Sequence, residues 1–301
     1  MPRNKSIVGE PLPVGKLGNL SYSTFDNWLQ CPKKVELSKI RKAPTQGAWW
    51  FTGGTAVHTA TEAYDRWSLL DPTGRPRFNL HEEWERAFDS TLWEDQERHP
   101  DLDQWRHGGN KDTPETHDRW KITLGPELVA SYIKWRQRSQ WTLWLTPDGE
   151  PGIELDLAGQ FPGAALLVKA YVDRIFSDPI MDQLIVVDLK SGTRQPDSPL
   201  QLGVYGAGMA IKYGVHATWG YCFMNRKGEL GKPYDLTKYT PEYVGKQFGY
   251  LNKAVDCGIY PAHVTNSCRM CDVSTACYAQ GGEFSKLFDP DDPDWVGNVP
   301  F

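Results

Sequence analysis

Two acidic residues and a lysine stand inside two neighbouring apolar segments of the chain. Asp173 lies in Ala170-Tyr-Val-Asp-Arg-Ile175, and Asp188 and Lys190 lie in Ile185-Val-Val-Asp-Leu-Lys190. Because strand side chains alternate between two faces, Asp188 and Lys190 share one face if their segment is a strand. Two carboxylates beside an ammonium in apolar surroundings are unfavourable unless a cation binds, and their hard oxygens suit Mg²⁺ or Mn²⁺. Such an ion can activate water for phosphodiester cleavage, while Lys190 positions or polarises the nucleophile.

The Asp-x-Lys pattern alone is weak, because ion-paired strand ends produce it too. Gly54-Thr-Ala-Val-His58 precedes it on a predicted helix, and His58 is either a third metal ligand or an ordinary half-buried histidine. Gln201-Leu-Gly-Val-Tyr205 follows it, with Gln201 and Tyr205 on one helical face, where simple packing is the alternative. The ordered set G-x-x-x-H, D-R, D-x-K and Q-x-x-x-Y is far more specific than any of its members.

Three cysteines lie close together in a polar segment with the spacing C-x2-C-x5-C: Cys268, Cys271 and Cys277. Three thiols are one short of a tetrahedral zinc site or a cubane iron–sulfur site, and Cys31 is the candidate for the fourth ligand. The spacing does not separate zinc from iron–sulfur, and buried thiols without a ligand are a third alternative. Cys222, in a predicted apolar strand, and Cys257, near a predicted helix end, are expected to be packing residues.

These residues need a framework of helices and strands, which the apolar periodicity predicts. A helix is expected to begin at Ser23, in a pattern close to a capping box, and to end at Pro32, which places Cys31 at its end. Further helices are predicted over 55–70, 80–97 (with Asn79 as N-cap), 125–140, 199–213 and 242–255, and strands over 153–157, 166–176, 184–189 and 217–224. Asp173 and Asp188 thus lie late in successive predicted strands. The pattern predicts a helical N-terminal half followed by an α/β core.

From about Leu20 to Tyr278 the chain resembles the RecB/AddB-type branch of the PD-(D/E)xK nuclease superfamily. The resemblance implies an α/β restriction-endonuclease-like core, with a mixed central sheet flanked by helices, a helical N-terminal lobe and an iron–sulfur C-terminal cap. The implied metal ligands are His58, Asp173, Asp188 and the main-chain carbonyl of Leu189. Lys190 would be the catalytic lysine, and Gln201 and Tyr205 would help to hold DNA. Glu62, one helical turn after His58, is a further candidate near the metal. One departure is that Lys169-Ala170-Tyr171 stands where the family often has glycine.

The cysteines add to this resemblance. Ser21-Tyr-Ser23 and Trp28-Leu-Gln-Cys31-Pro32 are similar to the N-terminal segments of the family's iron–sulfur members. Those members include AddB and the CRISPR-associated RecB-like exonucleases, which use one cysteine before the nuclease core and three after it. The implied cofactor is a four-iron four-sulfur cluster on Cys31, Cys268, Cys271 and Cys277, with structural Zn²⁺ as the alternative.

Composition and charge limit the class of protein. The 301 residues include 40% hydrophobic and 24% charged residues, the usual mix of a globular protein. No apolar run approaches the roughly 18 residues of a membrane span, and Met1–Glu10 has no apolar signal region, so a cytoplasmic location is expected. The net charge of −5 argues against a uniformly basic nucleic-acid binder. The charge is uneven, however, because residues 1–43 are basic and the last 21 residues are acidic. The basic segment is interpreted either as a local contact for a polyanion or as a solvated face.

We expect a flexible N-terminus over residues 1–19, a single nuclease domain over 20–280 and an acidic tail over 281–301. Within the domain, a helical lobe spans about 55–145, the catalytic core about 150–256, and a cluster-binding segment 257–280, joined to Cys31.

The resemblance implies a metal-dependent exonuclease that cuts single-stranded or frayed DNA ends in recombination, repair or CRISPR-type processing. Its location would be a bacterial, archaeal or phage-infected host cytoplasm. Recombination or CRISPR adaptation proteins are the expected protein partners, and no membrane is involved. The alternative function is a DNA-end-binding assembly factor with weak or no nuclease activity.

Overall fold

The structure, a computed structural model, describes residues 16–107 and 116–281. Residues 1–15 of the predicted flexible N-terminus (1–19) lie outside the described residues. The same holds for residues 282–301 of the predicted acidic tail (281–301). The described residues form two compact units. The cysteine unit comprises those within Met1–Thr45, Pro162–Val168 and Gly245–Phe301, and the sheet unit those within Gln46–Phe161 and Lys169–Val244. The assignment of residues 20–280 to a single domain stays a prediction.

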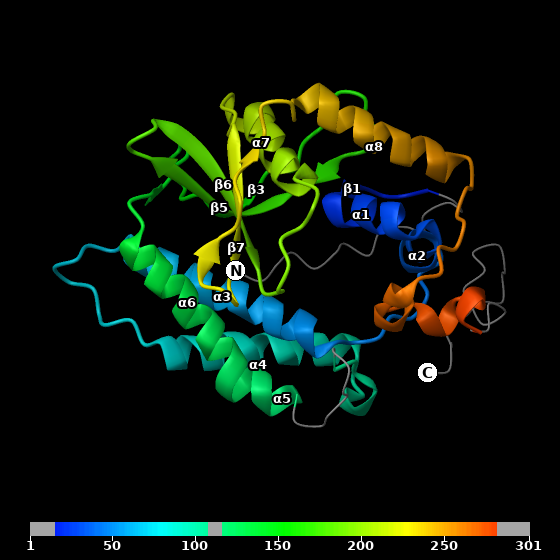
Figure 1. Cartoon of the computed structure of the whole chain (residues 1–301), viewed down its shortest axis with the longest axis horizontal. Coiled ribbons are helices and arrows are strands. Elements are labelled where there is room, and N and C mark those ends of the chain that lie inside the picture. Colours follow the sequence, from blue (N-terminus) through cyan, green and yellow to red (C-terminus); the bar gives the residue numbers. More distant parts are fainter. Residues whose placement is uncertain (1–15, 108–115, 282–301) are drawn as a thin grey trace. The chain divides into compact units, whose positions relative to one another are not determined.

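The sheet unit is built on a mixed seven-stranded sheet (Figure 1). Its path runs β2–β5–β6–β7–β8, while β3 also pairs with β5 and β9 with β7. The strands are β2 (Thr142–Leu143), β3 (Ile153–Asp156), β5 (Tyr171–Asp178), β6 (Gln183–Lys190), β7 (Trp219–Met224), β8 (Glu229–Leu230) and β9 (Tyr234–Asp235). β5 and β6 are antiparallel, whereas β6 and β7 are parallel. A parallel pair needs a crossover connection, and α7 (Leu200–Tyr213) provides it.

Helices lie on both sides of this sheet (Figure 1). One side carries α3 (Trp49–Ser68), α4 (Leu80–Arg98) and α6 (Gly125–Arg138), with the short elements η2 (Leu102–Gln104), α5 (Thr116–Asp118) and η3 (Arg119–Leu124). Their buried side chains form one apolar core with Ile185, Val187 and Leu189, which alternate along β6 as a period of two requires. The helix α7 lies on the other side. The expected mixed sheet with flanking helices is thus confirmed, whereas the iron–sulfur cap stays a prediction.

The helix α3 begins at Trp49, six residues before its predicted start. Glycine has a low helix propensity, so Gly53 and Gly54 weaken the sequence signal here. Tertiary packing stabilises this end of the helix instead: Trp49 is buried with its ring centroid 4.8 Å from that of Trp105, and Gly53 lies directly under the Trp120 ring.

The cysteine unit contains several helices, most of them short. They are α1 (Tyr22–Gln30), α2 (Pro32–Val35), η1 (Glu36–Ile40), most of α8 (Pro241–Asp256), η4 (Asn266–Met270), η5 (Ser274–Ala276) and η6 (Tyr278–Gln280). Leu20 of β1 (Leu20–Ser21) donates its N–H to the Leu167 carbonyl at 2.9 Å, just before β4 (Val168–Lys169). Among all described residues, no helix has both the length and the apolar character to cross a membrane.

Helix ends were predicted with mixed success. Asn79 caps α4, where its side chain accepts a hydrogen bond from the Glu82 N–H. The predicted start of α1 at Ser23 is wrong: Ser21 is the N-cap, because its Oγ accepts from the Thr24 N–H at 3.2 Å. The predicted end is confirmed, since α1 stops at Gln30 and Cys31 separates it from α2.

The fit between α6 and α4 gives a stability prediction. A Cβ at Gly125 would lie 1.9 Å from the Trp84 ring, and the Trp84 Nε1 is fixed by donating to the Lys121 carbonyl at 2.8 Å. Alanine normally stabilises a helix relative to glycine by about 1 kcal/mol. We nevertheless expect Gly125→Ala to lower the free energy of unfolding by about 1–3 kcal/mol, measured by urea denaturation with circular dichroism.

Gly74→Ala is the matched control, because a Cβ there meets open space. We expect it to change the free energy of unfolding by less than about 0.5 kcal/mol. A Gly125→Ala protein as stable as the wild type would show that the α4–α6 contact is looser than described.

Candidate functional site

The two predicted acids meet on adjacent strands. Arg174 of β5 pairs with Val187 of β6 in an antiparallel register, so Asp173 and Asp188 hold the next position along their strands. Asp188 lies late in β6, as predicted, but Asp173 lies near the start of β5, so its predicted late position is wrong. The acids meet nonetheless, because an antiparallel pair brings the start of one strand beside the end of the other.

A third acid, Glu154 of β3, was not among the predicted site residues. The register of β3 against β5 places it opposite Asp173. The φ of Glu154 is +49°, in the left-handed region, which costs a residue with a side chain on the order of 1 kcal/mol or more. Regular pairing on either side of Glu154 holds this strained conformation. Its sequence signal was only one acid in an alternating strand, and the register against β5 is what reveals it.

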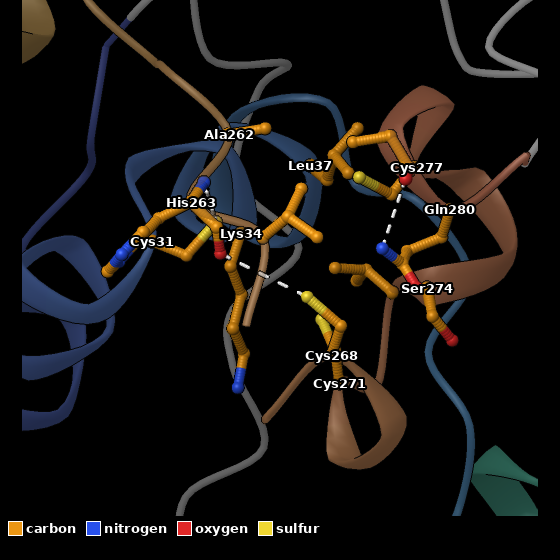
Figure 2. A pocket seen from close by; sticks show the side chains of 13 residues that line it. Cys31, Lys34, Leu37, Ala262, His263, Cys268, Cys271, Ser274, Cys277 and Gln280 are labelled. Carbon is orange, nitrogen blue, oxygen red and sulfur yellow. Dashed lines mark hydrogen bonds between the residues drawn. The ribbon is translucent and has the colours of Figure 1, made fainter. Parts of the chain in front are cut away.

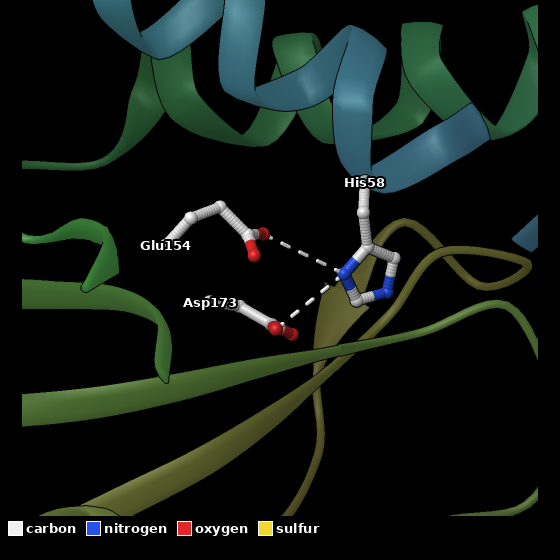
Figure 3. A group of neighbouring side chains, drawn as sticks. All are labelled: His58, Glu154 and Asp173. Atoms are coloured by element: carbon white, nitrogen blue, oxygen red, sulfur yellow. Dashed lines mark ion pairs between the residues drawn. The ribbon is translucent and has the colours of Figure 1, made fainter. Parts of the chain in front are cut away.

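His58 reaches the acids from α3 (Figure 3). Its Nδ1 lies 3.4 Å from Asp173 Oδ1 and 3.8 Å from Glu154 Oε1. Burial by itself lowers the pKa of His58, but the charges of Asp173 and Glu154 and the hydrogen bonds to them outweigh burial and raise the pKa to about 10. With this raised pKa the imidazole is protonated at neutral pH.

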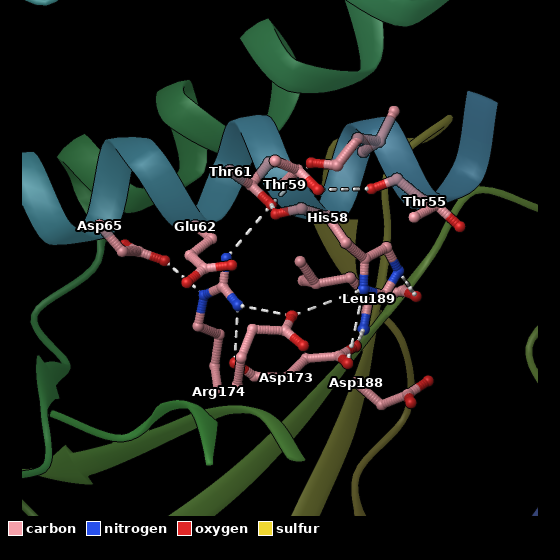
Figure 4. A network of polar contacts seen from close by, with 12 residues as sticks. Thr55, His58, Thr59, Thr61, Glu62, Asp65, Asp173, Arg174, Asp188 and Leu189 are labelled. Carbon is pink, nitrogen blue, oxygen red and sulfur yellow. Dashed lines mark hydrogen bonds and ion pairs between the residues drawn. The ribbon is translucent and has the colours of Figure 1, made fainter. Parts of the chain in front are cut away.

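The peptide group of Leu189 is held from both sides (Figure 4). Its N–H donates to Asp173 Oδ2 at 2.6 Å, and its carbonyl oxygen lies 3.1 Å from His58 Nε2. The structure therefore brings the carbonyl named by the resemblance to the same imidazole as the two acids of β3 and β5.

Asp188 and Lys190 belong to a closed ring of polar contacts with α7. Lys190 Nζ lies 2.6 Å from Asp188 Oδ2 and donates to Gln201 Oε1 at 2.9 Å. Gln201 Nε2 donates to Tyr205 Oη at 2.8 Å, and this hydroxyl faces Asp188 Oδ1 at 3.5 Å. The ring confirms that Asp188 and Lys190 share one strand face and that Gln201 and Tyr205 share one helical face.

Electrostatics act differently on the Asp188 and Lys190 members of this ring. Burial raises the pKa of Asp188, and the neighbouring Lys190 offsets only part of that rise. Burial alone would lower the pKa of Lys190, but the charge of Asp188 outweighs it, so the pKa of Lys190 is raised. The ammonium therefore stays protonated beside the acids.

Arg174 supplies a fully buried positive charge between the acids and α3 (Figure 4). Its Nε donates to Asp65 Oδ2 at 2.6 Å and its Nη2 to Thr61 Oγ1 at 3.2 Å, both on α3. Its Nη1 donates to the Asp173 carbonyl at 2.6 Å and to the Glu154 carboxylate at 3.3 Å. One guanidinium therefore orients Glu154 and joins the strand of Asp173 to α3.

The donor set fits a divalent cation. His58, Glu154 and Asp173 each offer one ligand atom, and these atoms lie within 4.8 Å of one another. Carboxylate oxygens and a main-chain carbonyl suit Mg²⁺ or Mn²⁺, and an imidazole suits the softer Mn²⁺ as well. Glu62, the further candidate from the sequence, instead forms an ion pair with Arg66 at 2.8 Å.

The four predicted cluster cysteines lie around one pocket in the cysteine unit (Figure 2). The sulfur-bearing residues of this pocket are Cys31, Cys268, Cys271 and Cys277. Two main-chain N–H groups point at sulfur: that of His263 at Cys31 Sγ and that of Thr265 at Cys268 Sγ, both at 3.4 Å. N–H groups directed at sulfur suit a thiolate, the form in which cysteine binds a metal.

The other two cysteines differ from each other. Cys222 is buried in β7, as expected for a packing residue, and burial raises the pKa of its thiol to about 12. The expectation that Cys257 packs is wrong, because Cys257 is exposed in the turn that follows α8.

Comparisons with known proteins agree with this geometry. The family model of the PD-(D/E)XK nuclease superfamily matches residues 19–278. The chain is 32% identical over 274 residues to the Gene 69 protein of Mycobacterium phage D29, covering 87% of this chain and 97% of that protein. It is 26% identical over 282 residues to the Gene 69 protein of Mycobacterium phage L5, covering 85% and 95%.

We expect Arg174→Met to lower the free energy of unfolding by about 3 kcal/mol or more, because the buried Asp65 loses one of its two arginine partners and keeps only Arg136. The matched control is Arg66→Met, which removes an exposed ion pair between Arg66 and Glu62, both on α3. This variant should lower the free energy of unfolding by less than about 1 kcal/mol. Urea denaturation of both variants measures the difference. Equal losses would mean that the Arg174 contacts add no more stability than a surface pair.

Proposed function

The chain belongs to the PD-(D/E)XK nuclease superfamily, and from this premise we propose that it is a divalent-metal-dependent DNA exonuclease acting on single-stranded or frayed duplex ends. The observation that carries the proposal is the convergence of His58, Asp173 and the Asp188–Lys190 pair where the start of β5 lies beside the end of β6. Metal-assisted phosphodiester hydrolysis needs such a group of acids with a positive charge beside it.

The metal ligands in this proposal are His58, Asp173, Asp188, the main-chain carbonyl of Leu189 and, in addition, Glu154. Bound Mg²⁺ or Mn²⁺ supplies an activated water and neutralises the charge that develops on the phosphate. Lys190 is the catalytic lysine: its ammonium, held by Asp188 and Gln201, orients the attacking water. Water attacks the phosphate directly, so no covalent enzyme intermediate forms.

The helix α7 holds DNA in this proposal through Gln201 and Tyr205. Gln201 is half-buried and faces Lys190, so it is the side chain that touches a phosphate or sugar beside the reacting group. Tyr205 is only 5% exposed and bonds to the Gln201 amide. Tyr205 therefore acts by holding Gln201 in place.

The branch of the superfamily is the RecB/AddB type, closest in motif order to the CRISPR-associated iron–sulfur exonucleases. Its support is the order His58, Asp173, Asp188, Lys190 and Gln201 along the chain. Because both similar proteins come from mycobacterial phages, we assign the activity to DNA recombination, repair or CRISPR-type processing in the cytoplasm of an infected host. Proteins of recombination or CRISPR adaptation are the corresponding partners.

A four-iron four-sulfur cluster is the proposed second cofactor, with Zn²⁺ as the alternative. Four cysteines line one pocket, and two main-chain N–H groups face their sulfurs. Cys31 and Cys271 are 240 residues apart, so the cluster would join distant parts of the chain within the cysteine unit. Its role in this proposal is to stabilise the fold.

We expect Lys190→Met to lower kcat by about 100-fold or more, because the water loses the cation that orients it. The assay measures nucleotide release from end-labelled single-stranded DNA with Mg²⁺ or Mn²⁺. Lys134→Met, an exposed lysine of α6, is the control and should cut like the wild type. Circular single-stranded DNA should resist, because an exonuclease needs an end.

Cleavage by Lys190→Met at the wild-type rate would contradict the catalytic assignment. A wild type that binds DNA ends but never cuts with either metal would favour the alternative, a DNA-end-binding assembly factor. Efficient cutting of circular DNA would identify an endonuclease.

We expect protein purified without oxygen to be brown, with about four iron atoms per chain if one cubane cluster is present. Cys271→Ser should lose the visible absorbance and most of the iron. Cys257→Ser is the matched control, since that thiol is exposed and does not line the pocket. A colourless protein with one zinc per chain would replace the iron–sulfur assignment by the zinc alternative.

A further inference from the structure

Two adjacent glycines of α3, one helical turn before His58, each lie against a different element. A Cβ at Gly53 would stand 2.2 Å from the Trp120 ring, and one at Gly54 would stand 3.3 Å from Ser191 Oγ. The segment that carries Trp120 and the loop that follows Lys190 therefore both rest on this turn. Arg119, which directly precedes Trp120, and Arg226, which bonds to the loop after Lys190, are exposed basic residues near this turn.

Arg226 extends from a well-fixed turn between β7 and β8. The preceding residue, Asn225, is 1% exposed; its N–H donates to the Lys190 carbonyl at 3.1 Å, and its carbonyl accepts from Ser131 Oγ at 2.6 Å. Arg226 Nε then donates to the Ser191 carbonyl at 2.9 Å. The guanidinium is thus anchored next to the loop that follows Lys190, and Arg226 is exposed.

Arg119 is exposed and directly precedes the buried Trp120 in η3. Leu124 of the same helix, η3, lines one pocket with Asn225 and Arg226, so η3 lies beside the turn that carries Arg226. In agreement with this position, burial and, after it, the positive charge of Arg119 lower the pKa of Arg226. In the part of the chain that the structure describes, neither forms an ion pair with a carboxylate. The nearby Lys121, by contrast, is paired with Asp89 at 2.8 Å.

We propose that Arg119 and Arg226 bind one backbone phosphate of the DNA strand beside the metal site. Two cations without a carboxylate partner next to Lys190 are unfavourable in the free protein, and an anion between them removes that repulsion. Guanidinium groups bind phosphate oxygens through paired N–H donors, which also fixes the position of the strand. The inference rests on the proposed nuclease function and adds to it the site that holds the strand.

Arg119→Gln, Arg226→Gln and the double variant test this site by fluorescence anisotropy with a labelled single-stranded oligonucleotide. Arg119→Gln is the cleaner test, since it leaves the Arg226–Ser191 hydrogen bond intact. The matched control is Arg86→Gln, which removes the same charge from an Arg–Glu83 pair on α4. Binding is measured without divalent metal over a range of salt concentrations, so that no strand is cut.

We expect each site variant to raise Kd roughly three- to ten-fold and the double variant to reduce the salt slope of log K by about 0.7, the value for one phosphate contact on a single strand. In the cleavage assay KM should rise more than kcat falls. Arg86→Gln should change Kd by less than about two-fold.

The outcomes separate the two proposals. A wild type that cuts DNA, with Kd and salt slope unchanged in the double variant, overturns the phosphate site and leaves the nuclease function standing. Loss of binding in Arg226→Gln but not in Arg119→Gln also overturns it, because the site needs both cations. A wild type that neither binds nor cuts DNA overturns the nuclease function itself.

Discussion

The buried guanidinium of Arg174 is the contact on which the rest of the sheet unit depends. It bonds to Asp65 and Thr61 of α3, to the Asp173 carbonyl of β5 and to the Glu154 carboxylate of β3. A charge taken fully out of water is tolerated only when every donor finds a partner. The need to satisfy this one group therefore fixes how α3 lies against the strands, and hence where the imidazole of α3 meets the acids.

The charged side chains of the site compensate one another in pairs. His58 is paired with Asp173 and Glu154, and Lys190 with Asp188. Glu154 and Asp173 are also held by hydrogen bonds, Glu154 from the Arg174 guanidinium and Asp173 from the Leu189 N–H.

The cysteine unit contains four thiols around one pocket. One apolar cluster of this unit is small and consists of Leu37, Ala43, Val273, Ala276 and Cys277; three of these residues, Leu37, Val273 and Cys277, also line the pocket of the four cysteines. Small apolar clusters of this kind are often supported by a metal, which is the role we propose for the cofactor.

Local rules were enough to predict part of this protein. A period of two put Asp188 and Lys190 on one face, a helical spacing of four put Gln201 and Tyr205 together, and Pro32 set the end of α1 beside Cys31, because each of these relations involves neighbours in the chain. Glu154, the position of Asp173 at the start of β5, and the meeting of η3 and the loop after Lys190 on α3 depend on strand register and on close packing at Gly53 and Gly54. Only the tertiary structure decided these, since register and packing join residues that no local pattern connects.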